Sequence, residues 1–132
     1  MNGHCEIMAK RVVKTLKFEI ISHEEEMKQL IQDIEAGKEQ KEDLIMSFED
    51  TATFAKFFTK ERLRLLKAIK SQKPKSLYAL AKLLKRDFKN VQTDAKYLEA
   101  NQLITLEKYK EGKMTKLRPV TYLEKIELEM AL

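Results

Sequence analysis

Residues 76–104 read SLYALAKLLKRDFKNVQTDAKYLEANQLI and hold two short helical patterns separated by a polar break. In each pattern, apolar residues recur at spacings that place them on one face of a helix. They are Leu77, Leu80, Ala81 and Leu84 in the first pattern, and Phe88, Val91, Ala95 and Leu98 in the second. Asp87 precedes the second pattern, where its carboxylate can accept the free amides of the first helical turn. Two short helices joined by a turn of about three or four residues form a helix-turn-helix.

The second helix, expected over about residues 88–101, carries a polar stripe opposite its apolar face. The stripe consists of Lys89, Asn90, Gln92, Thr93 and Lys96. Amide, hydroxyl and ammonium groups are those that pair with base edges and phosphates in a DNA major groove. A solvated helix face carries the same residue types, so the stripe alone leaves both interpretations open.

Basic residues are concentrated around this pair of helices. Residues 1–55 have a net charge of −5 and residues 119–132 have −2, whereas residues 56–118 have +12, within a chain total of +5. A local concentration of this kind is the electrostatic signature of a module that binds a polyanion. It favours the DNA interpretation of the polar stripe.

The composition is typical of a helix-rich soluble protein. A chain of 132 residues suggests one domain with a small appended element, and 36% of the residues are charged while 43% are apolar. No apolar run is long enough to span a bilayer, and the N-terminus has no secretory pattern. The single cysteine, Cys5, excludes an internal disulfide and fits a reducing compartment. We therefore expect a cytoplasmic protein that has no contact with membranes.

Two segments at the ends of the chain read as strands. Residues 12–21 mix β-branched and aromatic side chains in alternation, and residues 126–130 alternate strictly between apolar and acidic residues. We expect these two segments to pair with each other, within one subunit or between two. A helix capped by Ser22 follows the first strand and is expected to end near Gly37. A charged connector, residues 38–43, and a short extended piece, residues 44–49, come next.

Two further helices are expected before the helix-turn-helix. The first is short and capped by Asp50 or Thr51. Its aromatic residues are Phe54, Phe57 and Phe58. Aromatic residues at helical spacing are more typical of a core than of ligand stacking. The second begins after Thr59, and it completes the set of three consecutive helices that a helix-turn-helix needs to bury its core.

A basic β-hairpin is expected over about residues 103–122, with its turn at residues 110–113 and Gly112 at positive φ. A hairpin after a recognition helix is a wing, and its cations can bind the phosphate backbone. These cations are Lys108, Lys110, Lys113, Lys116 and Arg118. Further phosphate contacts are expected from Ser76, Tyr78, Lys85 and Arg86. The alternative role of the hairpin charges is protection of a strand edge.

These segments together resemble the winged helix-turn-helix of MarR/ArsR-type regulators. The resemblance is greatest to a small prokaryotic group of DNA-binding transcriptional regulators with an N-terminal strand-and-helix extension. The group's pattern T-x-x-R-x-x-L-L is matched by Thr59, Arg62, Leu65 and Leu66, and R-D-x-K-N-V-x-x-D by Arg86, Asp87, Lys89, Asn90, Val91 and Asp94. The wing proline and a following Y-x-x-I correspond to Pro119, Tyr122 and Ile126. The similarity covers about residues 48–128.

One position departs from the pattern of the group. Gln102 stands where the group usually has Gly at the end of the recognition helix, and we expect Asn101 to adopt the left-handed conformation instead. Some members of the group resemble antitoxins, which implies autoregulation and a toxin partner.

Enzymatic and metal-binding functions find no support in the sequence. It has no Gly-rich phosphate loop, nucleophile elbow or paired-His metal motif. His4, Cys5 and His23 lack the spacing of a zinc site, and we expect no metal and no cofactor. Asp94 is expected to pair with a Lys or Arg rather than to perform acid–base catalysis.

The sequence thus predicts a helix-rich α+β protein that acts as a dimeric, sequence-specific transcriptional regulator on double-stranded DNA. Residues 1–55 would form a strand-helix extension for homodimerisation, residues 56–122 the winged helix-turn-helix, and residues 123–132 a C-terminal strand. The alternative function is a winged-helix module for protein interaction, such as an antitoxin that neutralises a toxin by direct contact.

Overall fold

The computed structural model describes residues 13–35 and 44–130, and this part of the chain contains five helices and two sheets. The elements are β1 (Thr15–Ile20), α2 (His23–Glu35), β2 (Leu44–Phe48), α3 (Thr51–Phe57), α4 (Lys60–Gln72), α5 (Leu77–Leu84), α6 (Phe88–Ala100), β3 (Thr105–Glu111), β4 (Met114–Val120) and β5 (Lys125–Met130). The mixture of helices and separate sheets is compatible with the predicted α+β class.

The three-stranded sheet joins the two ends of the chain. Its order is β2-β1-β5, and β1 is parallel to both of its neighbours. The expected alternation of β1 is present, because Leu16, Phe18 and Ile20 are buried on one side of the strand. The hypothesis that the C-terminal segment pairs with the N-terminal strand is confirmed, and the pairing takes place within one chain, with Phe18 beside Leu128.

The predicted helix starts are correct where the structure describes a cap. Asp50, rather than Thr51, caps α3 by accepting a hydrogen bond from the backbone amide of Thr53 at 2.8 Å. This bond lowers the pKa of the Asp50 carboxyl. Thr59 and Ser76 cap α4 and α5 in the same way, and Asp87 caps α6 by accepting from the amide of Lys89.

One hydrophobic core runs from the sheet into the helices. Leu65, Leu80 and Leu98 of α4, α5 and α6 are fully buried in the same cluster as Leu16 and Phe18 of β1. Aromatic side chains join the sheet to α3. The ring centroids of Phe54 and Phe58 both lie 5.0 Å from that of Phe18, as the core assignment of these aromatic residues predicts.

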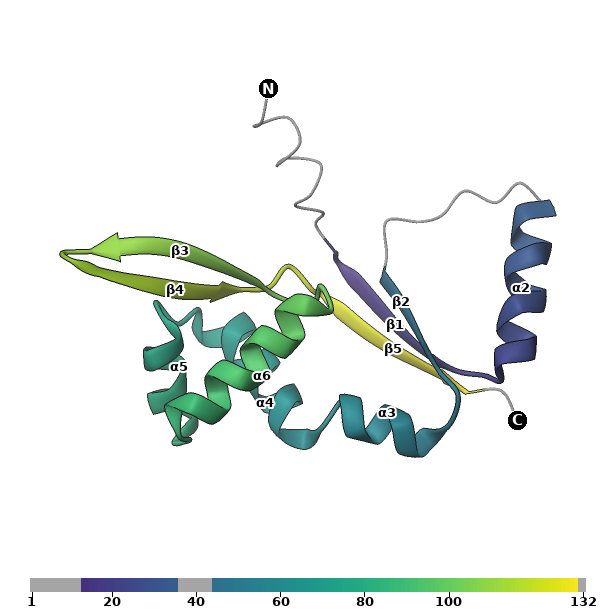
Figure 1. Ribbon diagram of the computed structural model, residues 1–132, viewed down its shortest axis with the longest axis horizontal. Helices are drawn as coiled ribbons and strands as arrows, with labels where there is room; N and C mark the ends of the chain where they lie inside the picture. The colour runs from purple at the N-terminus through teal and green to yellow at the C-terminus, as the bar shows by residue number, and fades with distance from the viewer. Residues whose placement is uncertain (1–12, 36–43, 131–132) are drawn as a thin grey trace, which may run out of the picture.

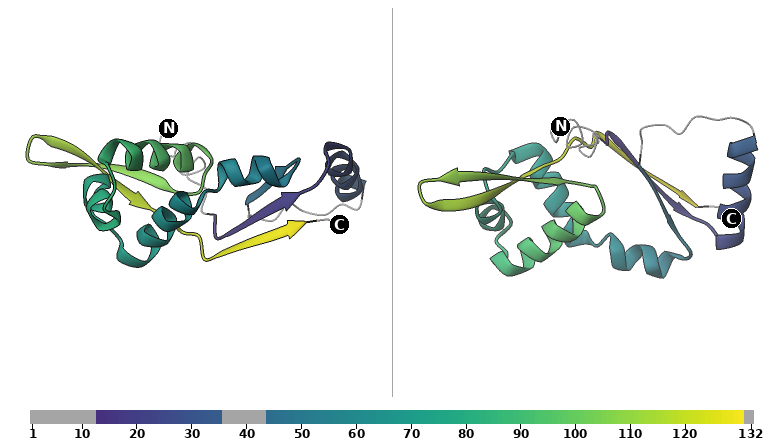
Figure 2. Two further views of the ribbon diagram at one scale, coloured as in Figure 1. Left: turned by 90° about the horizontal axis from the view of Figure 1, so that it is seen from below. Right: turned by 45° about the horizontal axis from the view of Figure 1, so that its top comes forward.

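The molecule is elongated. In Figure 1 the antiparallel β3–β4 hairpin projects beyond α4, α5 and α6 at one end, and the three-stranded sheet extends toward the other. Figure 2 shows the same arrangement in two further views, with α2 standing apart from the helices at the sheet end. The hairpin turn contains Gly112 at a φ of 65°, as expected.

The prediction about the end of α6 is wrong. Asn101 has a φ of −98°, and Gln102 itself adopts the left-handed conformation at 69°. The reason is the hydrogen bonding of the last turn. The amide of Leu103 bonds to the carbonyl of Leu98 at 2.9 Å, and that of Gln102 bonds to the carbonyl of Glu99 at 3.0 Å. This pair of bonds is the Schellman motif, which requires the left-handed residue at Gln102.

Some predicted features lie outside the described residues: His4, Cys5, the first residue of the expected strand at Val12, the helix end at Gly37 and the connector over residues 38–43. Within the described parts of the chain, no helix is both long and apolar enough to cross a bilayer.

Candidate nucleic-acid interface

Helix α6 presents two different faces. Val91, Ala95 and Leu98 are fully buried against the core, which determines how the helix is rotated. The opposite side carries the predicted polar stripe. In it, Lys89, Asn90, Thr93 and Lys96 are exposed, and Gln92 is half-buried. The structure therefore brings these five polar side chains together on the outer side of one helix.

Thr93 already makes one bond within the stripe. Its hydroxyl donates to the carbonyl oxygen of Lys89 at 2.9 Å, which is the usual back-bond of a helical threonine. The hydroxyl oxygen can still accept a hydrogen bond, and Thr93 as a whole is exposed. Thr93 can therefore act as an acceptor or an apolar contact without breaking this bond.

Helix α5 begins with two residues that the sequence assigned to phosphate binding. Ser76 is 8% exposed, and its hydroxyl accepts from the amide of Ala79 at 3.1 Å, so its oxygen serves the helix cap. Tyr78 is 59% exposed, with the ammonium of Lys82 at 4.7 Å from its ring. Of Ser76 and Tyr78, only Tyr78 has a side chain that is exposed at the surface.

The two cations of the turn between α5 and α6 lie in different environments. Lys85 is exposed and ends α5 in the left-handed conformation, at a φ of 55°. Arg86 instead points into the molecule. Its Nη1 lies 3.0 Å from Oδ2 of Asp94, and its Nε lies 3.4 Å from Oε2 of Glu61.

Asp94 is the centre of a cluster that the sequence showed only in part. The expectation that Asp94 pairs with a basic residue is confirmed, but its two partners were not foreseen: Arg86 from the turn, and Arg62 from α4 at 3.2 Å. Arg62 also donates to the carbonyl of Phe57 at 2.6 Å and covers the ring of Tyr97 at 4.1 Å. The sequence did contain a signal for this cluster. Arg62, Arg86 and Asp94 all occupy motif positions of the patterns on which the family resemblance rests.

The predicted basic side chains of the β3–β4 hairpin differ in their contacts. Lys108, Lys110 and Lys113 are exposed. Lys116 pairs with Glu111 at 3.0 Å, and this hydrogen bond raises the pKa of the Lys116 ammonium. Arg118 stacks over the ring of Tyr109 at 4.9 Å. Because the Tyr109 hydroxyl donates to the carbonyl of Lys75 at 2.7 Å, the hairpin is tied to the loop that precedes α5.

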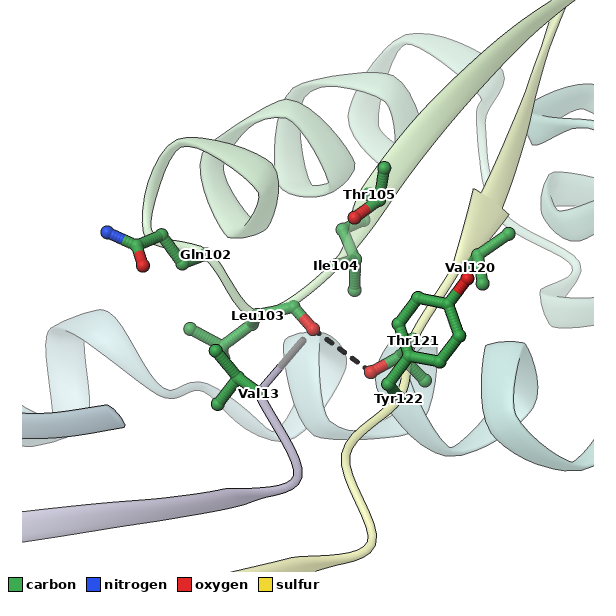
Figure 3. A pocket seen from close by; sticks show the side chains of 8 residues that line it. All are labelled: Val13, Gln102, Leu103, Ile104, Thr105, Val120, Thr121 and Tyr122. Carbon is green, nitrogen blue, oxygen red and sulfur yellow. Dashed lines mark hydrogen bonds between the residues drawn. The ribbon is translucent and has the colours of Figure 1, made fainter. Parts of the chain in front are cut away.

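Two hollows adjoin the hairpin. An open groove of about 900 Å³ lies where the end of α4 and the loop after it meet the hairpin, and it is lined by lysines of α4 and the loop together with Arg118, Glu107 and Glu111. Figure 3 shows the second hollow, where the Thr121 hydroxyl donates to the carbonyl of Leu103 at 3.0 Å. Its volume of about 10 Å³ is that of a single water. Among the described residues, no group of His, Cys, Asp or Glu side chains is arranged to hold a metal ion.

Comparison with known proteins places the chain in a family. No curated protein and no solved structure matches it. The family model HVO_A0114 matches residues 57–128, which is more than half of the chain. The matched span includes α4, α5, α6 and the hairpin, together with most of β5. The chain therefore belongs to the HVO_A0114 family.

Proposed function

We propose that this protein binds double-stranded DNA sequence-specifically, as a dimeric transcriptional regulator of the winged helix-turn-helix type. The observation that carries the proposal is the outer face of α6. Its five polar side chains lie together on a helix whose other face is buried and whose first turn is capped by Asp87. A helix held in this way can enter a major groove without losing its orientation.

The polar stripe has the chemistry of direct base readout. The side-chain amides of Asn90 and Gln92 can form paired hydrogen bonds with adenine, and the ammonium groups of Lys89 and Lys96 can reach guanine acceptors or phosphates. Thr93 can contact a thymine methyl group. We therefore assign base reading to all five residues.

Exposed residues around the stripe would supply the phosphate contacts. They are Tyr78 and Lys85 beside α6, and Lys108, Lys110 and Lys113 on the hairpin. Lys116 can join them if DNA displaces Glu111, and Arg118 is itself exposed and can donate to a phosphate while it stacks on Tyr109. Ser76 and Arg86 are assigned a supporting role instead, because their polar atoms already hold the helix cap and the Asp94 cluster.

Two substitutions separate base reading from phosphate binding. Gln92→Ala should reduce the preference for the cognate site, at a cost of about 1–3 kcal/mol on that site. Lys113→Ala should weaken binding to all duplexes about equally and reduce the salt slope by about 1. The measurement is the affinity for the DNA upstream of the protein's own gene and for a scrambled duplex, across a salt series.

Lys28→Ala is the matched control, because Lys28 is an exposed cation on α2, remote from α6 and the hairpin. Its salt slope should equal that of the unmodified protein. Absence of any binding at low salt would contradict the proposal. Unchanged binding in both Gln92→Ala and Lys113→Ala would show that the wrong face has been assigned, and would direct the search to a protein partner.

A further inference from the structure

Among the described residues, strand β5 leaves one edge of the three-stranded sheet unpaired. It is the last strand in the order β2-β1-β5, and all six of its residues are exposed. Its apolar side chains Ile126, Leu128 and Met130 are 36%, 54% and 45% exposed. Residues on one face of a strand alternate with those on the other, so these three side chains share a face.

That face continues the buried face of the sheet. In the parallel register, Ile126, Leu128 and Met130 stand beside the buried residues Leu16, Phe18 and Ile20. Over β1 and β2 the face is covered by aromatic side chains of α3, with Phe54 contacting both Phe18 and Phe48. Over β5, in the part of the chain that the structure describes, the apolar row remains open to solvent.

We propose that β5 pairs antiparallel with β5 of a second copy of this chain, so that the two sheets form one continuous sheet. The partner's strand would satisfy the outward backbone groups of β5, which any open edge presents. In the register argued below, Ile126 and Leu128 would lie beside Leu128 and Ile126 of the partner, respectively. The inference deepens the proposed function, since it gives the dimer of that proposal a defined contact.

The charges on the opposite face favour a two-fold register centred on Glu127. A two-fold axis perpendicular to the sheet pairs each residue with one of the same face. Centred on Glu127, it places Lys125 opposite Glu129 of the partner on both sides of the axis. Each Glu129 already bonds to Lys17 at 2.9 Å, so an alternating chain of charges would cross the interface.

The neighbouring registers are less favourable. Centring on Leu128 would place Glu127 opposite Glu129 in both copies, and like charges directly opposite one another are destabilising. Centring on Ile126 would pair only residues 125–127 within the strand. The costs of the favoured register are that each Met130 lies opposite Glu124 of the partner, just before the strand, and that there is one Glu127–Glu127 contact. Lys125 of the same chain moderates it, because its ammonium lies 3.0 Å from each Glu127 carboxylate.

Protection of the edge by charge is the competing explanation for Lys125, Glu127 and Glu129. The other devices that protect an edge are a proline, a bulge or an inward-pointing charge. Residues 125–130 contain no proline, and the ladder to β1 runs through all six residues without interruption. An edge built to repel strands would not expose an isoleucine, a leucine and a methionine in a row.

The first test is the oligomeric state without DNA. Light scattering after gel filtration should give twice the monomer mass of 15.5 kDa for the unmodified protein. Leu128→Asp should give the monomer mass with an unchanged helical circular dichroism spectrum. The matched control is Leu83→Asp on α5, also an exposed leucine at 51%, which should remain dimeric. Loss of the dimer in Leu30→Asp on α2, but not in Leu128→Asp, would overturn the proposal.

The second test determines the register in which the two β5 strands pair. In a background where Cys5 is replaced by Ser, Glu127→Cys should form a disulfide with its own copy under mild oxidation, because opposite Cα atoms lie about 4.5–5.5 Å apart. Lys125→Cys alone should not self-link, but should link to Glu129→Cys when the two variants are mixed. Failure of both expected links would overturn the pairing. Because neither test contains DNA, the pairing can fail while the DNA-binding proposal stands, and the reverse also holds.

Discussion

Gln102 ends α6 in the left-handed backbone conformation although it carries a side chain. Lys85 does the same at the end of α5 and Lys73 at the end of α4, with φ values of 55° and 47°. The left-handed region costs a residue with a Cβ atom about 1–2 kcal/mol. The last-turn bonds made through Gln102 and Leu103, together with the burial of Leu103, offset this cost.

Replacing Gln102 by glycine should therefore stabilise the protein. Glycine adopts positive φ without strain, and after allowance for its greater freedom in the unfolded chain we expect a gain of about 0.5–1 kcal/mol. Urea unfolding monitored by circular dichroism measures the change. Asn101→Gly is the control, because Asn101 has a negative φ and its replacement should destabilise. Stabilisation by Asn101→Gly, with none from Gln102→Gly, would show that the left-handed residue is misassigned.

At the scale of elements, the seating of α6 depends on Asp94 as well as on apolar packing. Arg62 connects this carboxylate to α4, and Arg86 connects it to the turn before α6. The buried Nη1 of Arg86 makes no well-aligned hydrogen bond to any residue that the structure describes, so its attraction to Asp94 at 3.0 Å is mainly electrostatic. The three side chains are only 15–19% exposed, which limits screening by water.

Asp94→Asn should remove the counter-charge that Arg62 and Arg86 share while preserving the shape of the side chain, and it should leave Arg86 with only the exposed Glu61. We expect a loss of about 2 kcal/mol in the free energy of unfolding. Glu61→Gln is the matched control: Glu61 also contacts Arg86, but its side chain is 44% exposed, and the expected loss is below about 1 kcal/mol. Denaturant titration of the two variants gives the comparison. Equal losses would mean that Asp94 has no special position in the cluster.

The elements themselves could be predicted because their signals are local. Caps such as Asp87 and Ser76 and the alternation of β1 lie within a few residues of the structure they specify. Side-chain partners distant in sequence could not be read in the same way. Arg86 looks like a surface cation of the turn, and only the fold shows that it faces Asp94 and Glu61. The parallel direction of β5 along β1 was equally invisible, since an alternating strand pairs in either direction.

At the scale of the whole molecule, the last strand that the structure describes pairs with the first. β5 follows the hairpin and docks beside β1, and the ammonium of Lys17 on β1 bonds to Glu129 of β5, which raises the pKa of Lys17. The family match from residue 57 to residue 128 ends within this returning strand. The sheet and the helices share one buried cluster, so the predicted boundaries at residues 55 and 122 do not divide the core.

A continuous core should unfold in one cooperative transition. The chain contains no tryptophan, so Phe48→Trp in β2 and Tyr97→Trp in α6 can report separately on the sheet and on the helices. At one protein concentration, the fluorescence midpoint in urea should coincide with the circular dichroism midpoint of the same variant, as two-state unfolding requires. Circular dichroism follows mainly the helices. The prediction would be contradicted if the fluorescence of Trp at position 48 changed at a lower urea concentration than the circular dichroism signal, while the fluorescence of Trp at position 97 did not. The sheet would then unfold before the helices, and the shared cluster would not couple the two parts.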